Sequence, residues 1–314
     1  MIPITKEQII ETIARISPHI HKTTIATSRI LDEMAKATLF FKCENFQRTG
    51  SFKIRGATNA ILSLTANEKA KGVVTHSSGN FAQALAMAAT SQGIKSWIVM
   101  PENAPNTKKD AVKQYGGEVI LCAPTLVARE TTAEKYVEKH GATFIHPFNQ
   151  LEVIQGQSTA AMELINEVQN LDYIVAPVGG GGLLSGTALA AHYFSPSTKI
   201  IGAEPLGADD AYKSFKQGVL IPQNNPQTIA DGLRTSLGTL TFPIIQVLVS
   251  EIKTVTEEQI IDALQLFWTR TKIVIEPSAA VALAVVLNTP ETFVGKRIGI
   301  ILSGGNIDLK HVSF

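Results

Sequence analysis

Short apolar runs alternate with amphipathic segments along most of the chain. The runs at 73–76, 173–178 and 296–302 are rich in Val and Ile and are followed by Ser or Gly, which is typical of buried strands that end in turns. Residues 5–16 instead place four isoleucines on one side of a 3.6-residue repeat, which predicts a helix. We therefore expect strands and helices in alternation.

The same pattern extends over the whole sequence. It predicts strands at 38–42, 73–76, 97–100, 118–122, 143–145, 173–178, 199–204 and 296–302. It predicts helices at 5–16, 28–37, 126–140, 158–169, 183–193, 209–216 and 256–272, with others that begin near Lys53, Asn80, Lys108 and Pro277. Such alternation implies parallel sheets covered on both faces. Because one compact sheet rarely holds so many strands, we expect an α/β protein with two doubly wound domains, largely parallel sheets and a boundary near Pro147.

Composition and charge exclude several classes of partner. Of the 314 residues, 45% are hydrophobic and 18% are charged, and the net charge of +1 provides no basic surface for nucleic acid or an anionic membrane. Two cysteines, Cys43 and Cys122, are too few for a disulfide framework. No apolar run reaches transmembrane length, and residues 1–16 lack the apolar centre of a signal peptide. We therefore expect a cytoplasmic protein without nucleic-acid or membrane partners.

Ligands in doubly wound folds bind beyond the carboxyl ends of strands, so the loops that follow strands are informative. Gly179 to Gly182 lie between a predicted strand and a predicted helix. Glycines there let backbone N–H groups approach an anion, and the helix N-terminus favours negative charge. The run matches neither the nucleotide-triphosphate nor the dinucleotide motif, which indicates a single phosphate. A flexible turn is the alternative.

Two further loops follow predicted strands. Residues 77–80 (Ser-Ser-Gly-Asn) have free N–H groups and two hydroxyls, which suit a carboxylate; an ordinary helix cap is the alternative. Residues 303–306 (Ser-Gly-Gly-Asn) provide a hydroxyl that can bond a neutral ring nitrogen; a plain turn is the alternative.

Lys53 lies between Phe52 and Ile54, just after Ser51, which is expected to cap the helix. A lysine in the first turn of a helix is unusual, since cations are disfavoured at that end. Burial and the helix dipole would both lower its pKa, and a neutral amine can form a Schiff base. The alternative is a lysine whose stem packs on apolar surface while its head reaches water. An amine, a phosphate cradle, a carboxylate cradle and a hydroxyl together meet the needs of pyridoxal phosphate and an amino-acid substrate.

Five motifs carry a resemblance to a known family. They are KCENFQRTGSFKIRGA, HSSGN, PVGGGGLLSG, EPLGADD and LSGGN. In order and spacing the chain resembles the fold-type II pyridoxal-phosphate enzymes of the serine/threonine dehydratase and serine racemase family, over nearly its whole length. The resemblance implies a fold similar to the tryptophan synthase β-chain. It implies a large cofactor-binding domain (1–47 and 148–314) and a small mobile domain (48–147) inserted in it, with Lys53 at their interface.

The resemblance also implies the roles of the cofactor site. The implied contacts are Phe52, Lys53, Asn80, Gly179, Gly180, Gly181, Gly182, Gly232, Glu276 and Ser303. Lys53 would bind the cofactor covalently, and the glycine run would hold its phosphate. Asn80 would contact the ring hydroxyl, and Ser303 would face the pyridine nitrogen with Glu276 nearby.

Substrate and metal contacts are likewise carried over from the resemblance. Ser77, Ser78, Asn80 and Arg129 would contact the substrate. Glu204, the carbonyl of Ala208 and Asp210 resemble a Mg²⁺ or Ca²⁺ site, because these ions prefer oxygen ligands; a solvated loop is the alternative.

We expect a dehydratase that converts L-threonine or L-serine to a 2-oxo acid and ammonia. Serine racemase and threo-3-hydroxyaspartate ammonia-lyase are the alternatives, because Ser78 could return a proton from the face opposite Lys53. Phe81 stands where many relatives have His, and Phe148 follows the dehydratase pattern. A non-catalytic binder of a phosphorylated metabolite and a β-replacement enzyme acting on O-acetylserine are the rival hypotheses. The resemblance suggests a homodimer, while substrate preference and nucleotide activation stay open.

Overall fold

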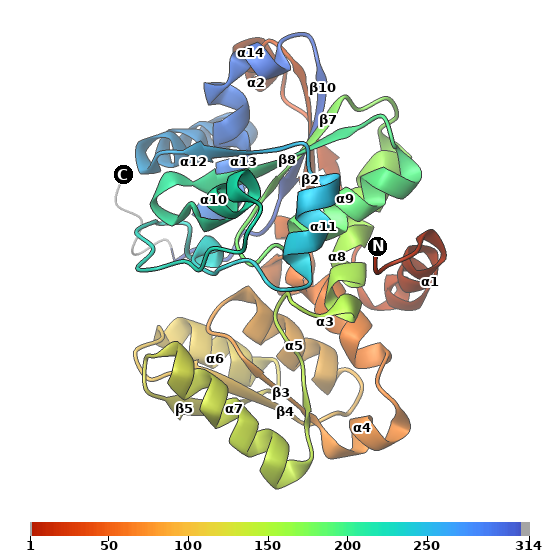
Figure 1. Ribbon diagram of the computed structural model, residues 1–314, viewed down its shortest axis with the longest axis vertical. Helices are drawn as coiled ribbons and strands as arrows, with labels where there is room; N and C mark the ends of the chain where they lie inside the picture. Colours follow the sequence, from red (N-terminus) through yellow and green to blue (C-terminus); the bar gives the residue numbers. More distant parts are fainter. Residues whose placement is uncertain (1, 309–314) are drawn as a thin grey trace.

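The computed structural model describes residues 2–308, and its strands form two separate sheets (Figure 1). The larger sheet has six strands in the order β1-β2-β10-β7-β8-β9. These are β1 (Ile25–Ala26), β2 (Thr38–Cys43), β7 (Tyr173–Pro177), β8 (Lys199–Pro205), β9 (Glu251–Val255) and β10 (Arg297–Leu302). Among these described strands, β1 and β2 pair antiparallel and all other neighbours pair in parallel.

The smaller sheet has four parallel strands in the order β5-β4-β3-β6. They are β3 (Val73–His76), β4 (Ser96–Pro101), β5 (Glu118–Cys122) and β6 (Thr143–Phe144). All four come from one continuous stretch of chain, whereas the larger sheet takes strands from both sides of that stretch.

Helices cover both faces of each sheet (Figure 1). They are α1 (Lys6–Ile16), α2 (Arg29–Ala35), α3 (Lys53–Leu62), α4 (Ala66–Lys71), α5 (Asn80–Thr90), α6 (Asn106–Gln114), α7 (Leu126–His140), α8 (Leu151–Glu167), α9 (Gly182–Phe194), α10 (Asp210–Gln217), α11 (Thr241–Leu248), α12 (Glu257–Thr271), α13 (Pro277–Asn288) and α14 (Pro290–Phe293). On the larger sheet, α2, α12 and α13 enclose one core and α8, α9 and α11 enclose another. The α/β class and the parallel sheets are confirmed.

Several elements differ from the prediction. The strands β1 and β9 and the helices α4, α11 and α14 were not predicted, because most are short and β9 lies at the sheet edge with charged residues in alternate positions. Helix α8 begins at Leu151 rather than at 158. Its first turns pack on α3 and α1, and this tertiary contact stabilises a segment whose own pattern is weak.

Helix α3, which begins with Lys53, lies between the two sheets (Figure 1). Two glycines permit its close contact with α8. A Cβ on Gly156 would lie only 2.5 Å from the Cα of Gly56 and from the carbonyl oxygen of Arg55. The backbones of α3 and α8 therefore meet directly.

Buried ion pairs hold α3 in the same place. The fully buried guanidinium of Arg55 donates to both oxygens of Glu44 (2.7 and 2.9 Å) and to both oxygens of Glu163 (2.7 and 2.8 Å). The buried ammonium of Lys42 lies 2.7 Å from Glu163. Two cations and two anions thus form a neutral cluster that ties α3 to β2 and α8, which satisfies charges that would be costly alone.

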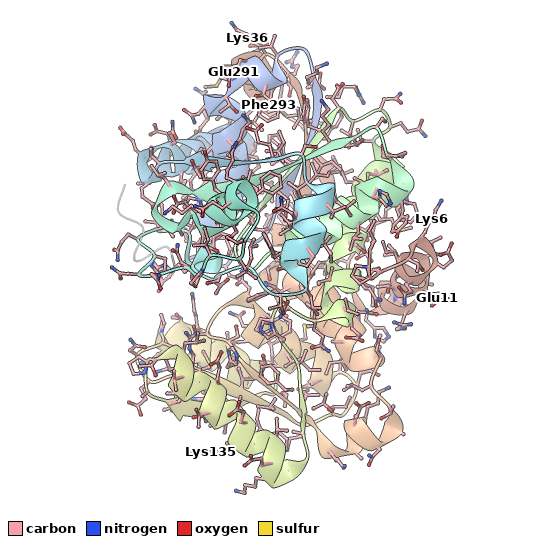
Figure 2. All side chains as sticks on the ribbon, in the orientation of Figure 1. Lys6, Glu11, Lys36, Lys135, Glu291 and Phe293 are labelled. Carbon is pink, nitrogen blue, oxygen red and sulfur yellow. The ribbon has the colours of Figure 1, made fainter. Side chains whose placement is uncertain are left out.

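Most charged side chains point away from the cores. Lys6 and Glu11 project outward from α1. Lys135 projects from α7 at the far end of the smaller unit, which is the part of the chain that forms the smaller sheet and the helices on it (Figure 2). The rest of the chain, with the larger sheet, is the larger unit. No described helix is long and apolar enough to cross a membrane.

Candidate active site

Lys53 is the first residue of α3, as predicted, and its side chain is partly buried. Its ammonium donates to the carbonyl oxygen of Pro147 at 3.2 Å. The ammonium nitrogen lies 5.0 Å from the ring centroid of Phe52 and 5.9 Å from that of Phe81. Burial lowers the pKa of Lys53 to about 8, although the charge of Glu276 opposes the shift. A lysine with this pKa supplies an appreciable fraction of neutral amine near neutral pH.

The expected cap by Ser51 is wrong. The helix is capped by Phe52, and no side chain accepts a hydrogen bond there. Ser51 adopts an extended conformation and forms a backbone bridge with Gly304 instead of capping the first turn. The buried Ser51 hydroxyl has no hydrogen-bond partner in the described part of the chain.

The loop after β10 pairs with the segment before α3. The N–H of Phe52 donates to the carbonyl oxygen of Ser303 at 3.0 Å, and the N–H of Gly305 donates to that of Gly50 at 2.9 Å. Ser303 is almost fully buried. The third predicted loop therefore lies directly beside Lys53.

The glycine run forms the turn between β7 and α9. Gly181 has φ = 87°, a conformation that favours glycine, and the run is flanked by Phe148, whose ring atoms would lie 2.4–2.5 Å from a Cβ on Gly180. Within residues 2–308, the backbone N–H groups of 179–182 have no hydrogen-bond acceptor. Free N–H groups at a helix N-terminus are suited to an anion.

Gly232 lies beside this run. A Cβ on Gly179 would come within 3.1 Å of the Gly232 carbonyl oxygen, and the Gly232 N–H donates to the Ser278 hydroxyl at 3.0 Å. The loop that carries Gly232 thus forms one wall of the glycine cradle.

Asn80 and Glu276 join the smaller unit to the larger. The amide of Asn80 donates to both carboxylate oxygens of Glu276, at 2.9 and 3.1 Å, and accepts from the amide of Asn306 at 2.9 Å. Burial and the charge of Asp231 raise the pKa of Glu276 to about 7. The contacts place the start of α5 next to the loop after β10.

Residues 77–79 connect β3 to α5, and neither serine caps the helix, since its cap is Gly79 without a side-chain bond. The Ser77 hydroxyl instead accepts the N–H of Gly79 at 3.4 Å. Arg129 lies on α7 and donates at 3.4 Å to the carbonyl oxygen of Thr125, the N-cap of that helix. Together with burial, its charge lowers the pKa of His76, the residue before Ser77.

Glu204 and Asp210 lie together near the buried Ala208. Burial and the charge of Asp210 raise the pKa of Glu204 to about 9, and burial raises that of Asp210 to about 7. Both Glu204 oxygens already accept backbone N–H groups of α10, but Asp210 Oδ1 is buried without a partner among the described residues. Its free oxygen suits a cation, although no group of three His, Cys, Asp or Glu side chains in residues 2–308 could hold a metal ion.

Sequence reasoning missed two features. The Arg55 ion cluster escaped notice because its acidic members are distant in sequence and polar residues in isolation do not indicate burial. The contact of Lys53 with Pro147 was also missed; the only signal was the predicted return of the chain near that proline.

Comparisons with known proteins identify the family. The family model described as "Pyridoxal-phosphate dependent enzyme" matches residues 16–304. The chain belongs to this family. A beta-hydroxyaspartate dehydratase of Paracoccus denitrificans is 50% identical over 305 residues, which cover 97% of this chain and 97% of that protein.

Solved structures of this pyridoxal-phosphate family agree with the fold. Serine racemase from Dictyostelium discoideum is 49% identical, with a TM-score of 0.94 over 98% of this chain and 99% of that one. A threonine deaminase from T.th. is 42% identical, with a TM-score of 0.93 over 98% of this chain and 99% of that one. The resemblance to the serine/threonine dehydratase branch, including its fold, is confirmed.

The side chains present fit pyridoxal phosphate. A partly buried amine of lowered pKa suits an aldehyde, and the acceptor-free N–H groups of the glycine run suit a phosphate. Ser303 offers a buried hydroxyl in the loop that is bonded to the segment before Lys53. Family membership implies the same cofactor.

Proposed function

We propose that this protein is a pyridoxal-phosphate-dependent ammonia-lyase that removes water from a small hydroxy amino acid. The enamine left after the loss of water tautomerises to an imine and takes up one water, so L-threonine would give 2-oxobutanoate and L-serine would give pyruvate, each with one ammonia. The observation that carries this proposal is the Lys53 amine, partly buried, with a pKa of about 8, beside the loop after β10. Similarity to a beta-hydroxyaspartate dehydratase and to threonine deaminase supports elimination chemistry.

The chain's own groups would share the work. When bound, the cofactor supplies an aldehyde for the amine and a ring that withdraws electrons from the α-carbon. The Lys53 amine then removes the α-proton, for which a pKa close to the working pH is favourable. The N–H groups and hydroxyls of residues 77–80 orient the substrate carboxylate, with Arg129 as a further contact. The Ser303 hydroxyl, unlike a carboxylate, does not hold a proton on the ring nitrogen, which favours prompt elimination.

Serine racemase and threo-3-hydroxyaspartate ammonia-lyase are the second candidates. The similarity to a serine racemase (49% identical) and to a beta-hydroxyaspartate dehydratase (50% identical) supports them equally. The Ser78 hydroxyl would return a proton on the face opposite Lys53. We further propose Mg²⁺ or Ca²⁺ at Glu204, Ala208 and Asp210, a cytoplasmic homodimer, and the division into domains 1–47 plus 148–314 and 48–147.

A substrate panel tests the function. Purified protein is incubated with L-serine, L-threonine and threo-3-hydroxyaspartate, with and without Mg²⁺, while 2-oxo acid and D-serine are measured. We expect 2-oxo acid from at least one substrate, and none from Lys53→Ala, which should also lose the near-visible absorbance of bound cofactor. In Ser78→Ala, D-serine formation should fall about 100-fold or more while elimination is kept.

Other outcomes would reassign the protein. D-Serine formed faster than pyruvate would make it a racemase, and preference for threo-3-hydroxyaspartate would make it that lyase. Cysteine formed from O-acetylserine and sulfide would indicate β-replacement. Absence of cofactor binding in the wild type would contradict the whole assignment.

A further inference from the structure

One short turn touches several parts of the site. It links β6 to α8 and consists of His146, Pro147, Phe148 and Asn149, here called the 146–149 turn. Its Pro147 carbonyl oxygen accepts from the Lys53 ammonium at 3.2 Å. Its Phe148 lies against the glycine run, since a Cβ on Gly180 would meet the ring at 2.4 Å and one on Gly182 would meet Cβ of Phe148 at 3.0 Å.

The last residue of the turn reaches a third part of the site. Asn149 Oδ1 accepts the N–H of Leu240 at 2.7 Å, and Nδ2 donates to the Thr239 hydroxyl at 3.1 Å. The next residue, Thr241, donates its hydroxyl to the Gly180 carbonyl oxygen at 2.8 Å. The turn therefore supports the glycine run from two directions, by direct contact and through the segment before α11.

The shape of the turn depends on one acceptor. His146 Nδ1 accepts the N–H of Asn149 at 2.9 Å and the N–H of Phe148 at 3.3 Å. Because Nδ1 accepts both bonds, the proton of the neutral ring lies on Nε2. The His146 N–H in turn donates to the Gln150 side chain at 3.0 Å, so the turn is closed on itself.

The surroundings keep this imidazole uncharged. Burial, His76 and the charge of Lys53 lower the pKa of His146 to about 4. Its ring packs edge-on against Phe148, with centroids 4.6 Å apart. A neutral ring can serve as a permanent acceptor for the turn, whereas a protonated ring would present a donor to two N–H groups.

We propose that His146 is a positioning residue whose Nδ1 holds the 146–149 turn in the shape that aligns the Lys53 amine with the glycine run. The proposal rests on the proposed function only for the identity of the cofactor. It is independent of which hydroxy amino acid is the substrate, and it concerns binding steps that precede the reaction.

Two substitutions distinguish the role of the Nδ1 acceptor from the role of the ring's volume. His146→Asn places an amide oxygen close to the position of Nδ1, and His146→Gln fills more of the volume but places its polar end near Nε2. If the Nδ1 acceptor matters, His146→Asn should lower cofactor affinity less than His146→Gln. If only packing matters, His146→Gln should lower it less. The ring borders a cavity of about 500 Å³, which can accommodate either side chain. His76→Gln is the control, because His76 lies beside the ring, with centroids 6.1 Å apart, but is not bonded to the turn.

Three measurements on the apoprotein show how each substitution affects the site. They are the affinity for inorganic phosphate, which reports the glycine run; the rate of reaction with pyridoxal, which lacks the phosphate and reports the amine; and the affinity for pyridoxal phosphate. In His146→Gln we expect pyridoxal phosphate to bind about 10- to 100-fold more weakly, with both partial readouts reduced, because two hydrogen bonds are lost. His146→Asn and His76→Gln should stay within about threefold of the wild type, well under the 1.4 kcal/mol that a tenfold change represents.

Equal losses in the Asn and Gln variants, or a greater loss in Asn, would overturn the proposal. So would a loss in phosphate affinity with unchanged pyridoxal reactivity, since the turn would then support only one part of the site. Failure of the wild type to bind pyridoxal phosphate would refute the proposed function instead. Nitrogen NMR of histidine-labelled wild type gives a test without variants: the Nε2–H form of His146 is expected, and the Nδ1–H form would contradict the proposal.

Discussion

Lys53 and Glu276 have pKa values displaced toward each other, to about 8 and about 7. Burial disfavours the charged form of each side chain, so it lowers the pKa of the base and raises that of the acid. The negative charge of Glu276 partly restores the charge on Lys53. The ammonium thus loses its proton far more readily than an exposed lysine, without losing it entirely at neutral pH.

This balance predicts a pH dependence. The rate at which apoprotein captures pyridoxal phosphate should rise with pH, with its midpoint near 8 and a plateau above about 9, because only the neutral amine reacts and its pKa is about 8 rather than 10.5. In Glu276→Gln the opposing negative charge is gone, so the midpoint should move to lower pH. Stopped-flow absorbance over pH 6–11 measures both. A wild-type midpoint near 10.5, or an upward shift in the variant, would contradict this account.

The backbone before Lys53 is held in a strained shape. Thr49 has φ = 60° and ψ = 12°, a left-handed conformation that is uncommon for a residue other than glycine. The Asn306 amide donates to its carbonyl oxygen at 2.7 Å, and the following Gly50 could not carry a Cβ, which would lie 2.3 Å from Asn306 Oδ1. Strain of this kind persists where neighbours impose it, as the loop after β10 does here.

At the scale of elements, two kinds of contact hold α3 against α8. The Arg55 ion cluster joins them at one point, and the Gly56–Gly156 contact brings their backbones together at another. A buried ion pair alone is weak evidence of stability, but it specifies which groups must meet. The result is that the helix carrying Lys53 has one defined position relative to the larger sheet.

The glycine contact gives a stability prediction. Gly156→Ala should lower the free energy of unfolding by roughly 1–3 kcal/mol, because its Cβ would lie 2.5 Å from backbone atoms of α3 that cannot move aside. Urea denaturation followed by circular dichroism measures the change. Gly79→Ala is the steric control, since a Cβ there meets nothing within 4 Å and the variant should lose only the preference of an N-cap for glycine over alanine, about 1 kcal/mol or less. Equal stability of the two variants would show that the α3–α8 contact can relax.

At the scale of the whole molecule, side-chain contacts among the described residues join the two units at the site. Asn80 bonds Glu276, and the ammonium of Lys108 on α6 pairs with Asp231 in the short 3₁₀ helix Asp231–Leu233. Both side chains of the Lys108–Asp231 pair are partly exposed, so the pair contributes little to global stability. It nevertheless joins the two units beside the loop that carries Gly232.

Removal of this pair should make the two units separate more readily at the site, while the free energy of global unfolding should change little. Lys108→Met should change the free energy of unfolding by less than about 1 kcal/mol. It should increase the rate at which a small amine-reactive reagent labels Lys53 in the apoprotein. Mass spectrometry of the proteolytic peptide that contains Lys53 measures this rate. Lys109→Met is the matched control, because the bond that Lys109 makes among residues 2–308 is to the carbonyl oxygen of Glu102 within its own unit. Equal labelling in both variants would argue against a link between the pair and access to the site.

The sequence alone determined much of this picture. The alternation of apolar runs and amphipathic segments is local, so it predicted the α/β class and most elements. The glycine run and the loops 77–80 and 303–306 are contiguous motifs, and the structure places each at the end of a strand. Short or edge elements such as β1 and β9 were missed because their own residues carry little periodic signal.

The tertiary structure decided everything that depends on distant partners. Lys53 meets Pro147 across 94 positions, Arg55 meets Glu163 across 108 and Asn80 meets Glu276 across 196. No local pattern specifies such pairs, because burial of a charge and the shift of its pKa depend on what the completed fold brings around it. Even the cap of α3 was decided in this way, since the bridge between Ser51 and Gly304 outweighed the local preference of a serine for a helix start.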